Sequence, residues 1–289
     1  MTAAGAKPRP AGAPSFALAL GGGGARGLAH IHVLEVLDEM GIRPVAIAGS
    51  SIGAIMGAAY AAGMTGKDIR DYATAVLSKP AEVAARLWQA RPATLKEQVK
   101  RSFRIGQFDV ERILAAFMPP QVPKTFAELS IPLTIAATDY FGRRLHVMKD
   151  GDLISAIGAS AALPAVFEPV QRDGRLLVDG GLFNPVPFDL LRGTADVIIA
   201  VDVVGAPQED EKAKPKTIDL LYSASQLMMH AIIDNKLAFD RPDIFLRPPV
   251  SRFRVLDFMK MDAIMRETAS IRDDLARGVE QAISARAKS

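Results

Sequence analysis

Short apolar runs that are typical of buried strands alternate along this chain with segments of helical periodicity. Strand signals recur at residues 16–20, 45–48, 133–138, 145–148, 176–178 and 197–201. Helical patterns lie between several of them, at residues 28–40, 52–62, 67–77, 110–117 and 153–158. Parallel strands must be joined by long crossovers, usually helices, so the alternation predicts an α/β fold. We expect three layers, α/β/α, with a largely parallel central sheet and an antiparallel turn at residues 139–144 at one side of it.

The composition divides the chain into three parts. Residues 1–15 are rich in Ala, Pro and Gly and lack the apolar run of about 7–15 residues that a signal peptide needs, so we expect a disordered tail. Residues 16–203 contain all the strands and helices named above and form the expected α/β domain. Residues 204–289 begin with a polar linker and should form a mostly helical portion packed on that domain. Its expected elements are helices at 218–239 and 262–285 and one short strand at 244–246.

Charge and cysteine content exclude several classes of function. The 289 residues include no cysteine, which excludes disulfides, thiolate metal sites and a cysteine nucleophile. The four histidines make a multi-histidine metal site hard to build. Lys and Arg number 35 against 32 Asp and Glu, and the net charge of +3 gives no argument for binding nucleic acid. The lack of cysteine fits a reducing compartment, so we expect the protein in the cytoplasm.

One uncharged stretch, residues 44–66, has the length of a membrane span. Ala and Gly dominate it rather than Leu, Ile and Phe, and it divides into a strand-like piece and a helix-like piece that begins after Ser51. We therefore interpret the stretch as a buried strand–turn–helix unit.

The turn of that unit carries a G-x-S-x-G motif, in which Gly49 and Gly53 flank Ser51. A strand that turns sharply into a helix strains the backbone of the central residue and leaves room only for glycines beside it. Such a nucleophile elbow exposes the serine hydroxyl at the carboxyl edge of the sheet. The motif predicts that Ser51 is a nucleophile, and the alternative is a glycine-rich turn that serves packing alone.

A second glycine-rich turn follows the first strand, where Gly22, Gly24 and Gly27 satisfy the dinucleotide fingerprint G-x-G-x-x-G. A dinucleotide site also needs an acidic residue at the end of the second strand to bind the ribose. That place holds Gly49 and two serines, so the fingerprint lacks its confirming residue. Successive glycine amides can instead bind an anion. Beside a nucleophilic serine, that anion is the oxyanion of a tetrahedral intermediate.

The four histidines do not supply an obvious base for a serine nucleophile. His30 and His32 lie two positions apart on one helix and point to different faces, so both cannot serve one site. His146 lies in a strand and His230 in a long apolar helix, where a structural role is the simpler interpretation.

Asp179 is a candidate for the base because it follows a strand signal directly and precedes Gly180 and Gly181. The acid then lies at the end of a strand, beside glycines that allow close approach, although a lone Asp-Gly pair is usually only a turn. Such a carboxylate could act on the serine directly. The order Ser51, Asp179, His230 also follows the α/β-hydrolase order of serine, acid and histidine, so a triad stays open as an alternative.

The glycine loop with Arg26, the serine elbow and the Asp-Gly-Gly turn occur in this order, and together they resemble the patatin-like phospholipase family. Residues 27–34 look like the first helix of that family, and residues 159–170 are similar to a stretch typical of its bacterial members. The resemblance covers residues 18–192 and looks like the compact bacterial form.

The resemblance implies a serine–aspartate dyad that works without histidine, cofactor or metal. Ser51 would be the nucleophile and Asp179 the base. The groups around the oxyanion would be the amides of Gly22, Gly23 and Gly24 and the side chain of Arg26. The family hydrolyses acyl esters of lipids, so the implied partner is a lipid or another acyl ester, and residues 16–203 would be the catalytic domain.

Two other functions stay open from the sequence. An acyltransferase would pass the acyl group from the same acyl-enzyme to an alcohol or a thiol. A nucleotide-binding regulator without catalytic activity would use the glycine loop for a dinucleotide.

A basic segment at residues 86–104 contains the only tryptophan of the chain, Trp88. Its bases are Arg86, Arg91, Lys96, Lys100, Arg101 and Arg104, and Glu97 is its single acid. Basic residues interleaved with Trp, Leu and Phe are typical of an interfacial helix or a lid, which predicts peripheral contact with an anionic membrane. The alternative is an ordinary solvated helix face, and Pro92 excludes one continuous helix.

Overall fold

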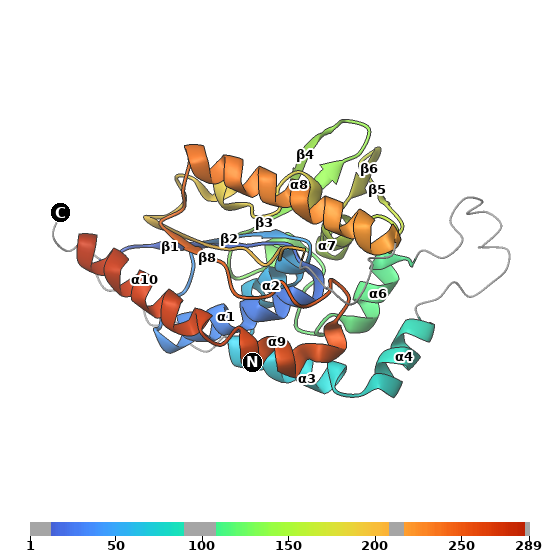
Figure 1. Ribbon diagram of the computed structural model, residues 1–289, viewed down its shortest axis with the longest axis horizontal. Coiled ribbons are helices and arrows are strands. Elements are labelled where there is room, and N and C mark those ends of the chain that lie inside the picture. The colour runs from blue at the N-terminus through green and yellow to red at the C-terminus, as the bar shows by residue number, and fades with distance from the viewer. Residues whose placement is uncertain (1–12, 90–107, 208–216, 287–289) are drawn as a thin grey trace.

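An eight-stranded sheet lies at the centre of the computed structural model, which describes residues 13–89, 108–207 and 217–286 (Figure 1). The strands are β1 (Phe16–Leu20), β2 (Ala46–Ser50), β3 (Leu133–Asp139), β4 (Arg144–Met148), β5 (Val170–Arg172), β6 (Arg175–Val178), β7 (Val197–Val201) and β8 (Ile244–Leu246). They follow the order β5-β6-β3-β2-β1-β7-β8, and β4 also pairs with β3. Strands β1, β2, β3, β7 and β8 are parallel, whereas β4, β5 and β6 form antiparallel pairs at one side.

Helices cover both faces of this sheet. They are α1 (His30–Glu39), α2 (Ile52–Ala61), α3 (Gly66–Leu77), α4 (Pro80–Gln89), α6 (Val110–Phe117), α7 (Leu153–Ala161), α8 (Thr217–Phe239), α9 (Met261–Glu267) and α10 (Ile271–Arg286). Figure 1 shows α8 on one side of the sheet and α1, α2, α9 and α10 on the other. The fold predicted from the sequence, an α/β architecture with three layers around a largely parallel sheet, is confirmed.

The first strand shows how one short segment serves two cores. Leu18 and Leu20 belong to the core on the side of α1, whereas Ala17 and Ala19 belong to a second core that includes Ile233 of α8. Successive strand residues point to opposite faces, so every residue of β1 is buried. Burial on both faces is what a continuous apolar run in a parallel sheet predicts.

The helix predicted at 262–285 is wrong in its continuity, because α9 and α10 are separate helices. Thr268, at the end of α9, is fully buried, and its hydroxyl donates a 2.7 Å hydrogen bond to the carbonyl of Ile264. The amide of Thr268 donates to the same carbonyl, and a turn in which the amide of Ile271 donates to the carbonyl of Thr268 then separates α9 from α10. The predicted strand at 244–246 is present as β8, and it joins the same sheet as the strands of the preceding α/β domain.

Two of the predictions from the sequence fall mainly outside the described residues. The basic segment at 86–104 is described only as far as Gln89, in α4, and residues 90–107 are not described. Residues 1–12 of the expected tail are not described either. The uncharged stretch at 44–66 contains β2 and α2. Of the helices that the structure describes, none combines the length and the apolar character that crossing a bilayer requires.

Candidate active site

Ser51 lies at the turn between β2 and α2, in a strained backbone conformation. Its φ of 53° and ψ of −122° place it outside the regions that ordinary residues occupy, at a cost of about 1–3 kcal/mol. The turn is so tight that a Cβ atom on Gly53 would lie 2.0 Å from the carbonyl oxygen of Leu20 in β1. Likewise, a Cβ atom on Gly49 would lie 2.6 Å from the backbone of Ala54. The G-x-S-x-G segment therefore forms the elbow that its sequence predicts, with glycine required on both sides of Ser51.

The hydroxyl of Ser51 donates a 2.6 Å hydrogen bond to Oδ2 of Asp179. The other carboxylate oxygen, Oδ1, accepts a 2.8 Å hydrogen bond from the amide of Gly181. The backbone of Asp179 is fixed as well, because its carbonyl accepts a hydrogen bond from Thr138 and its amide donates one to Ala162. The two residues of the predicted dyad are thus in direct contact, with two hydrogen bonds to the carboxylate and two to the backbone of Asp179.

The antiparallel direction of β6 explains how Asp179 reaches the elbow. Ser50, at the end of β2, pairs with Ala136 of β3, and Thr138 of the same strand pairs with Val178 of β6. Because β6 runs against β3, its carboxyl end returns toward the level of Ser51. The turn then passes so close to β3 that a Cβ atom on Gly180 would lie 2.1 Å from the carbonyl oxygen of Ala136.

Burial makes Asp179 a stronger base than an aspartate in water. Asp179 is only 3% exposed, and this burial raises the pKa of its carboxyl group to about 6. The hydrogen bonds from Ser51 and Gly181 act in the opposite direction, because they favour the ionised form. An ordinary aspartate has a pKa of about 3.9. The environment therefore moves the pKa of this carboxyl toward neutral pH, where a general base is most effective.

The glycine loop lies directly beside the elbow. A Cβ atom on Gly22 would lie 3.2 Å from Cβ of Ser51. The amide of Gly22 donates a 2.9 Å hydrogen bond to the carbonyl of Pro185, so it is already paired. The amides of Gly23 and Gly24 find no acceptor within the part of the chain that the structure describes. After them the chain forms a short 3-10 turn, Gly24–Ala29, in which Gly27 packs against Ile52 at the start of α2.

Arg26 takes a position that the sequence did not predict. Its Nε donates a 2.6 Å hydrogen bond to the carbonyl of Phe253, and its Nη1 donates to the carbonyl of Val204. The side chain is buried, and burial lowers the pKa of Arg26 to about 10. The guanidinium therefore connects the glycine loop to the end of β7 and to the C-terminal portion.

Three of the four histidines contact backbone carbonyls rather than the dyad. Nε2 of His30 lies 2.9 Å from the carbonyl oxygen of Gly21, and burial lowers the pKa of His30 to about 4. Nε2 of His230 lies 2.9 Å from the carbonyl oxygen of Gly205. His32 contacts a carbonyl of α9 in the same way. Within the described structure, neither Ser51 nor Asp179 hydrogen-bonds to a histidine, which removes the geometric basis of the triad alternative.

Ser160 is a residue of the site that sequence reasoning missed. Its hydroxyl accepts a 2.8 Å hydrogen bond from the amide of Ser51 and donates a 2.6 Å hydrogen bond to the carbonyl of Ala136. Ser160 is fully buried on α7. The only signal in the sequence was its place in the stretch 159–170, and no spacing connects it to the elbow.

The other acids at strand ends have their own partners. Asp139 accepts hydrogen bonds from the amide of Gly142 and from Arg144 and Arg175, and the amide of Gly142 is the main reason that the pKa of Asp139 is lowered. Asp202 pairs with Arg247 and also accepts from the amide of Val204. Across the described residues, acidic and histidine side chains do not gather in threes as the ligands of a metal ion would.

Comparisons with known proteins identify relatives of the chain. An uncharacterised NTE family protein of Mycobacterium tuberculosis is 38% identical over 199 residues, which cover 68% of this chain and 51% of that protein. Human patatin-like phospholipase domain-containing protein 6 is 30% identical over 279 residues, which cover 86% of this chain and 19% of that protein. The chain therefore spans about half the length of the mycobacterial relative and a smaller share of the human one.

A solved structure and a family model complete the comparison. VipD from Legionella pneumophila matches with a TM-score of 0.52 at 12% identity, over 93% of this chain and 67% of that chain, which shows a similar fold. The model of the patatin-like phospholipase family matches residues 18–192, a range that contains the glycine loop, the serine elbow and the Asp179 turn. With that match over more than half of its length, the chain belongs to the patatin-like phospholipase family.

Proposed function

We propose that the protein is a serine hydrolase of lipid acyl esters, with Ser51 as the nucleophile and Asp179 as the general base. The observation that carries the proposal is the 2.6 Å hydrogen bond from the Ser51 hydroxyl to a buried carboxylate. A nucleophile and a base within hydrogen-bond reach are the minimal requirement for acyl transfer through a covalent intermediate. The family and its phospholipase name support a lipid ester as the substrate.

In the acylation step, Oγ of Ser51 attacks the carbonyl carbon of the ester while its proton passes to Oδ2 of Asp179. The carbonyl oxygen becomes an oxyanion, and the amides of Gly23 and Gly24 are the donors proposed to stabilise it. The amide of Gly22 is paired with Pro185, so its contribution would require that bond to open. Asp179 then gives its proton to the leaving alkoxide, which departs as an alcohol and leaves the acyl group on Ser51.

Deacylation repeats the chemistry with water as the nucleophile. Asp179 accepts a proton as water attacks the acyl carbon, the oxyanion forms in the same place, and Oγ of Ser51 leaves with the proton from Asp179. Because the carboxylate of Asp179 transfers the proton in both acylation and deacylation, the reaction does not need a histidine. Loss of one oxyanion donor typically raises the barrier by about 2.7–4 kcal/mol, so catalysis depends on the position of the glycine loop as well as on the dyad.

The geometry of the site bears differently on the two alternative functions, an acyltransferase and a nucleotide-binding regulator. An acyltransferase would share every step until an alcohol or a thiol replaces water, and the residues described here favour neither acceptor. A nucleotide-binding regulator would use the glycine loop alone. The loop lies against Cβ of Ser51, and its Gly22 amide is occupied, so the structure does not favour a dinucleotide there.

Contact with a membrane surface is part of the same proposal. It rests on the composition of the segment at 86–104, in which bases and apolar residues alternate. Liposome co-sedimentation with Lys96, Lys100 and Arg101 changed to glutamate tests it. Binding to anionic vesicles that fades with salt and with the charge reversal supports the proposal, whereas unchanged binding excludes this segment.

Turnover of a soluble p-nitrophenyl ester and of phospholipid vesicles tests the catalytic assignment. We expect Ser51→Ala and Asp179→Ala each to lower kcat by on the order of 10⁴-fold or more. The double variant should be hardly worse than either single one, because members of one catalytic unit are not additive. Ser284→Ala, an exposed serine of α10, is the matched control and should retain full activity. Normal turnover by a folded Ser51→Ala protein would refute the assignment.

A further inference from the structure

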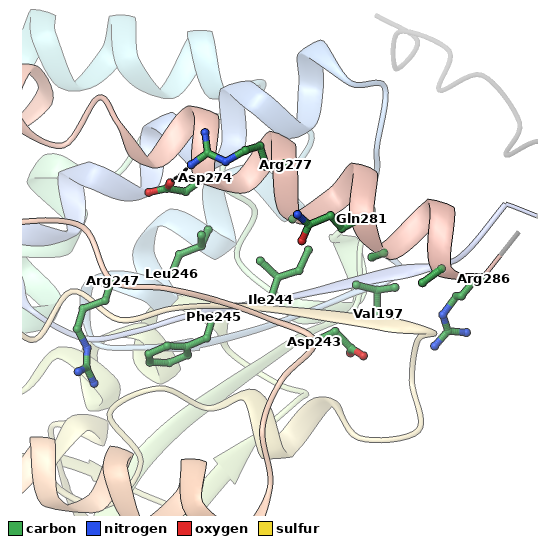
Figure 2. A pocket seen from close by; sticks show the side chains of 13 residues that line it. Val197, Asp243, Ile244, Phe245, Leu246, Arg247, Asp274, Arg277, Gln281 and Arg286 are labelled. Carbon is green, nitrogen blue, oxygen red and sulfur yellow. Dashed lines mark hydrogen bonds and ion pairs between the residues drawn. The ribbon is translucent and has the colours of Figure 1, made fainter. Parts of the chain in front are cut away.

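A groove of about 640 Å³ runs along the outer edge of the sheet, between β8 and α10 (Figure 2). Strand β8 is the last in the order of the sheet, and among the described residues β7 is the only strand that pairs with it. Figure 2 shows β8 along one wall of the groove and the side chains of Arg277 and Gln281 from α10 along the other. The groove is distant in the sheet order from β2 and β6, which carry the dyad.

The backbone of β8 presents an unused donor and acceptor to this groove. Leu246 faces β7, because its carbonyl accepts a 2.8 Å hydrogen bond from the amide of Asp202. In a parallel ladder, alternate residues of one strand face the neighbouring strand, so the amide and the carbonyl of Phe245 face outward. Neither group is hydrogen-bonded to any residue that the structure describes. An edge of this kind is a template for pairing with another strand.

An acid and a base lie at equal distances from Phe245 along the strand, one on each side of it. The sequence is Asp243, Ile244, Phe245, Leu246 and Arg247, with an acid at one end, a base at the other and apolar residues between. Oδ2 of Asp243 accepts a hydrogen bond from the amide of Ile198, and Nε of Arg247 binds Asp202. Oδ1 of Asp243 and Nη1 of Arg247 accept or donate no hydrogen bond within the described residues.

We propose that this edge binds a second copy of the chain, with the two β8 strands antiparallel and centred on Phe245. In that register, Phe245 lies opposite Phe245 of the second copy, and the two exchange both backbone hydrogen bonds. Asp243 then lies opposite Arg247 of the second copy, and the reverse pair forms by symmetry. A parallel pairing would instead place like charges side by side. The order of charges therefore selects one orientation and one register.

Small side chains on α10 leave room for the second copy beside the strand. Gly278, Ala282 and Ala285 all line the groove, at spacings that place them on one face of the helix. Gly278 also packs directly on Ile244, where a Cβ atom would lie 3.1 Å from that side chain. The larger side chains of α10 that line the groove, among them Arg277 and Gln281, are long and polar, and the small residues between them leave the strand edge open along one face of the helix. A twofold axis through Phe245 would extend the sheet continuously across both copies.

Cysteine cross-linking tests the register, because the chain contains no cysteine of its own. Residues that exchange both hydrogen bonds across an antiparallel pair have Cα atoms about 5.5 Å apart, which lies within the range of about 4.4–6.8 Å that a disulfide spans. The Phe245→Cys variant should therefore form a covalent dimer on mild oxidation. The Asp243→Cys variant should not, because four residues of offset separate its copies by about 13 Å or more. The double variant Asp243→Cys with Arg247→Cys should cross-link again.

The wild-type chain should elute in size-exclusion chromatography with light scattering at twice its mass of 30.9 kDa. Phe239→Cys is the control for random collisions, because Phe239 is 92% exposed at the end of α8 and outside the groove. If loss of the Phe245 ring unfolds the protein, the double variant tests the same register without it. A monomeric mass overturns the proposal. So does a dimer in which all the variants cross-link equally, or in which the register-specific variants fail to cross-link.

Discussion

The Ser51 hydroxyl donates a hydrogen bond of 2.6 Å to Asp179, although 128 positions separate the two residues in the chain. The contact depends on two turns that carry glycines, one after β2 and one after β6, which approach each other across β3. Neither turn by itself would raise the pKa of an aspartate enough to make it an effective base. The burial of Asp179 and its direct contact with the nucleophile together give a carboxylate with a raised pKa and a defined proton to accept.

The raised pKa of Asp179 predicts how activity depends on pH. The base accepts a proton only when ionised, so kcat/KM for a soluble ester should rise with pH, reach half its maximum near pH 6 and then level off. Burial also lowers the pKa of His146 from its usual value, so the experiment must distinguish the titration of His146 from that of Asp179. The His146→Gln variant should keep the same midpoint. A rate that is flat between about pH 5 and pH 8 would contradict the role of Asp179 as the base.

Ser160 should act through the backbone of the nucleophile. Removing its hydroxyl leaves the amide of Ser51 and the carbonyl of Ala136 without their partner, so the strained elbow is held less firmly. We expect Ser160→Ala to lower kcat about tenfold or more, which corresponds to about 1.4 kcal/mol, with little change in KM. Ser155→Ala on the same helix is the control and should leave both constants unchanged. Equal values of kcat for the Ser160→Ala and wild-type proteins would limit Ser160 to a packing role.

His230 distinguishes the dyad from a triad. Its ring contacts the carbonyl of Gly205, so His230→Ala should lose a structural hydrogen bond and retain activity within about tenfold. The measurement is kcat together with the melting temperature of the variant. A loss of on the order of 10⁴-fold at unchanged melting temperature would establish a triad in place of the dyad.

Local patterns in the sequence were sufficient for most of the fold. Continuous apolar runs marked β1, β3 and β7 because both faces of these strands are buried. The glycines of the elbow marked Ser51 because only glycine fits where the turn touches β1. Strand β5 was missed because only one of its three residues, Val170, is apolar, so no apolar run marks it. The break between α9 and α10 was missed because residues 268–270, where it lies, contain neither glycine nor proline.

The contacts between distant segments could not be predicted in the same way. That Arg26 would bind the carbonyls of Val204 and Phe253 depends on where the C-terminal portion packs, which no local pattern encodes. The bond from Ser51 to Ser160 depends on the position of α7 against β3. The contact between Ser51 and Asp179 came from a resemblance in the sequence, and its geometric cause, the antiparallel direction of β6, is visible only in the fold.

Covalent labelling with a fluorophosphonate tests the central claim most directly, with the intact mass of the protein as the readout. Oγ of an activated serine displaces fluoride from phosphorus, so the wild-type protein should gain the mass of one phosphonyl group. Ser51→Ala should gain none, and Asp179→Ala should be labelled far more slowly because its nucleophile has lost its base. An unchanged rate of labelling in folded Ser51→Ala protein would show that the reactive residue lies elsewhere and would contradict the account.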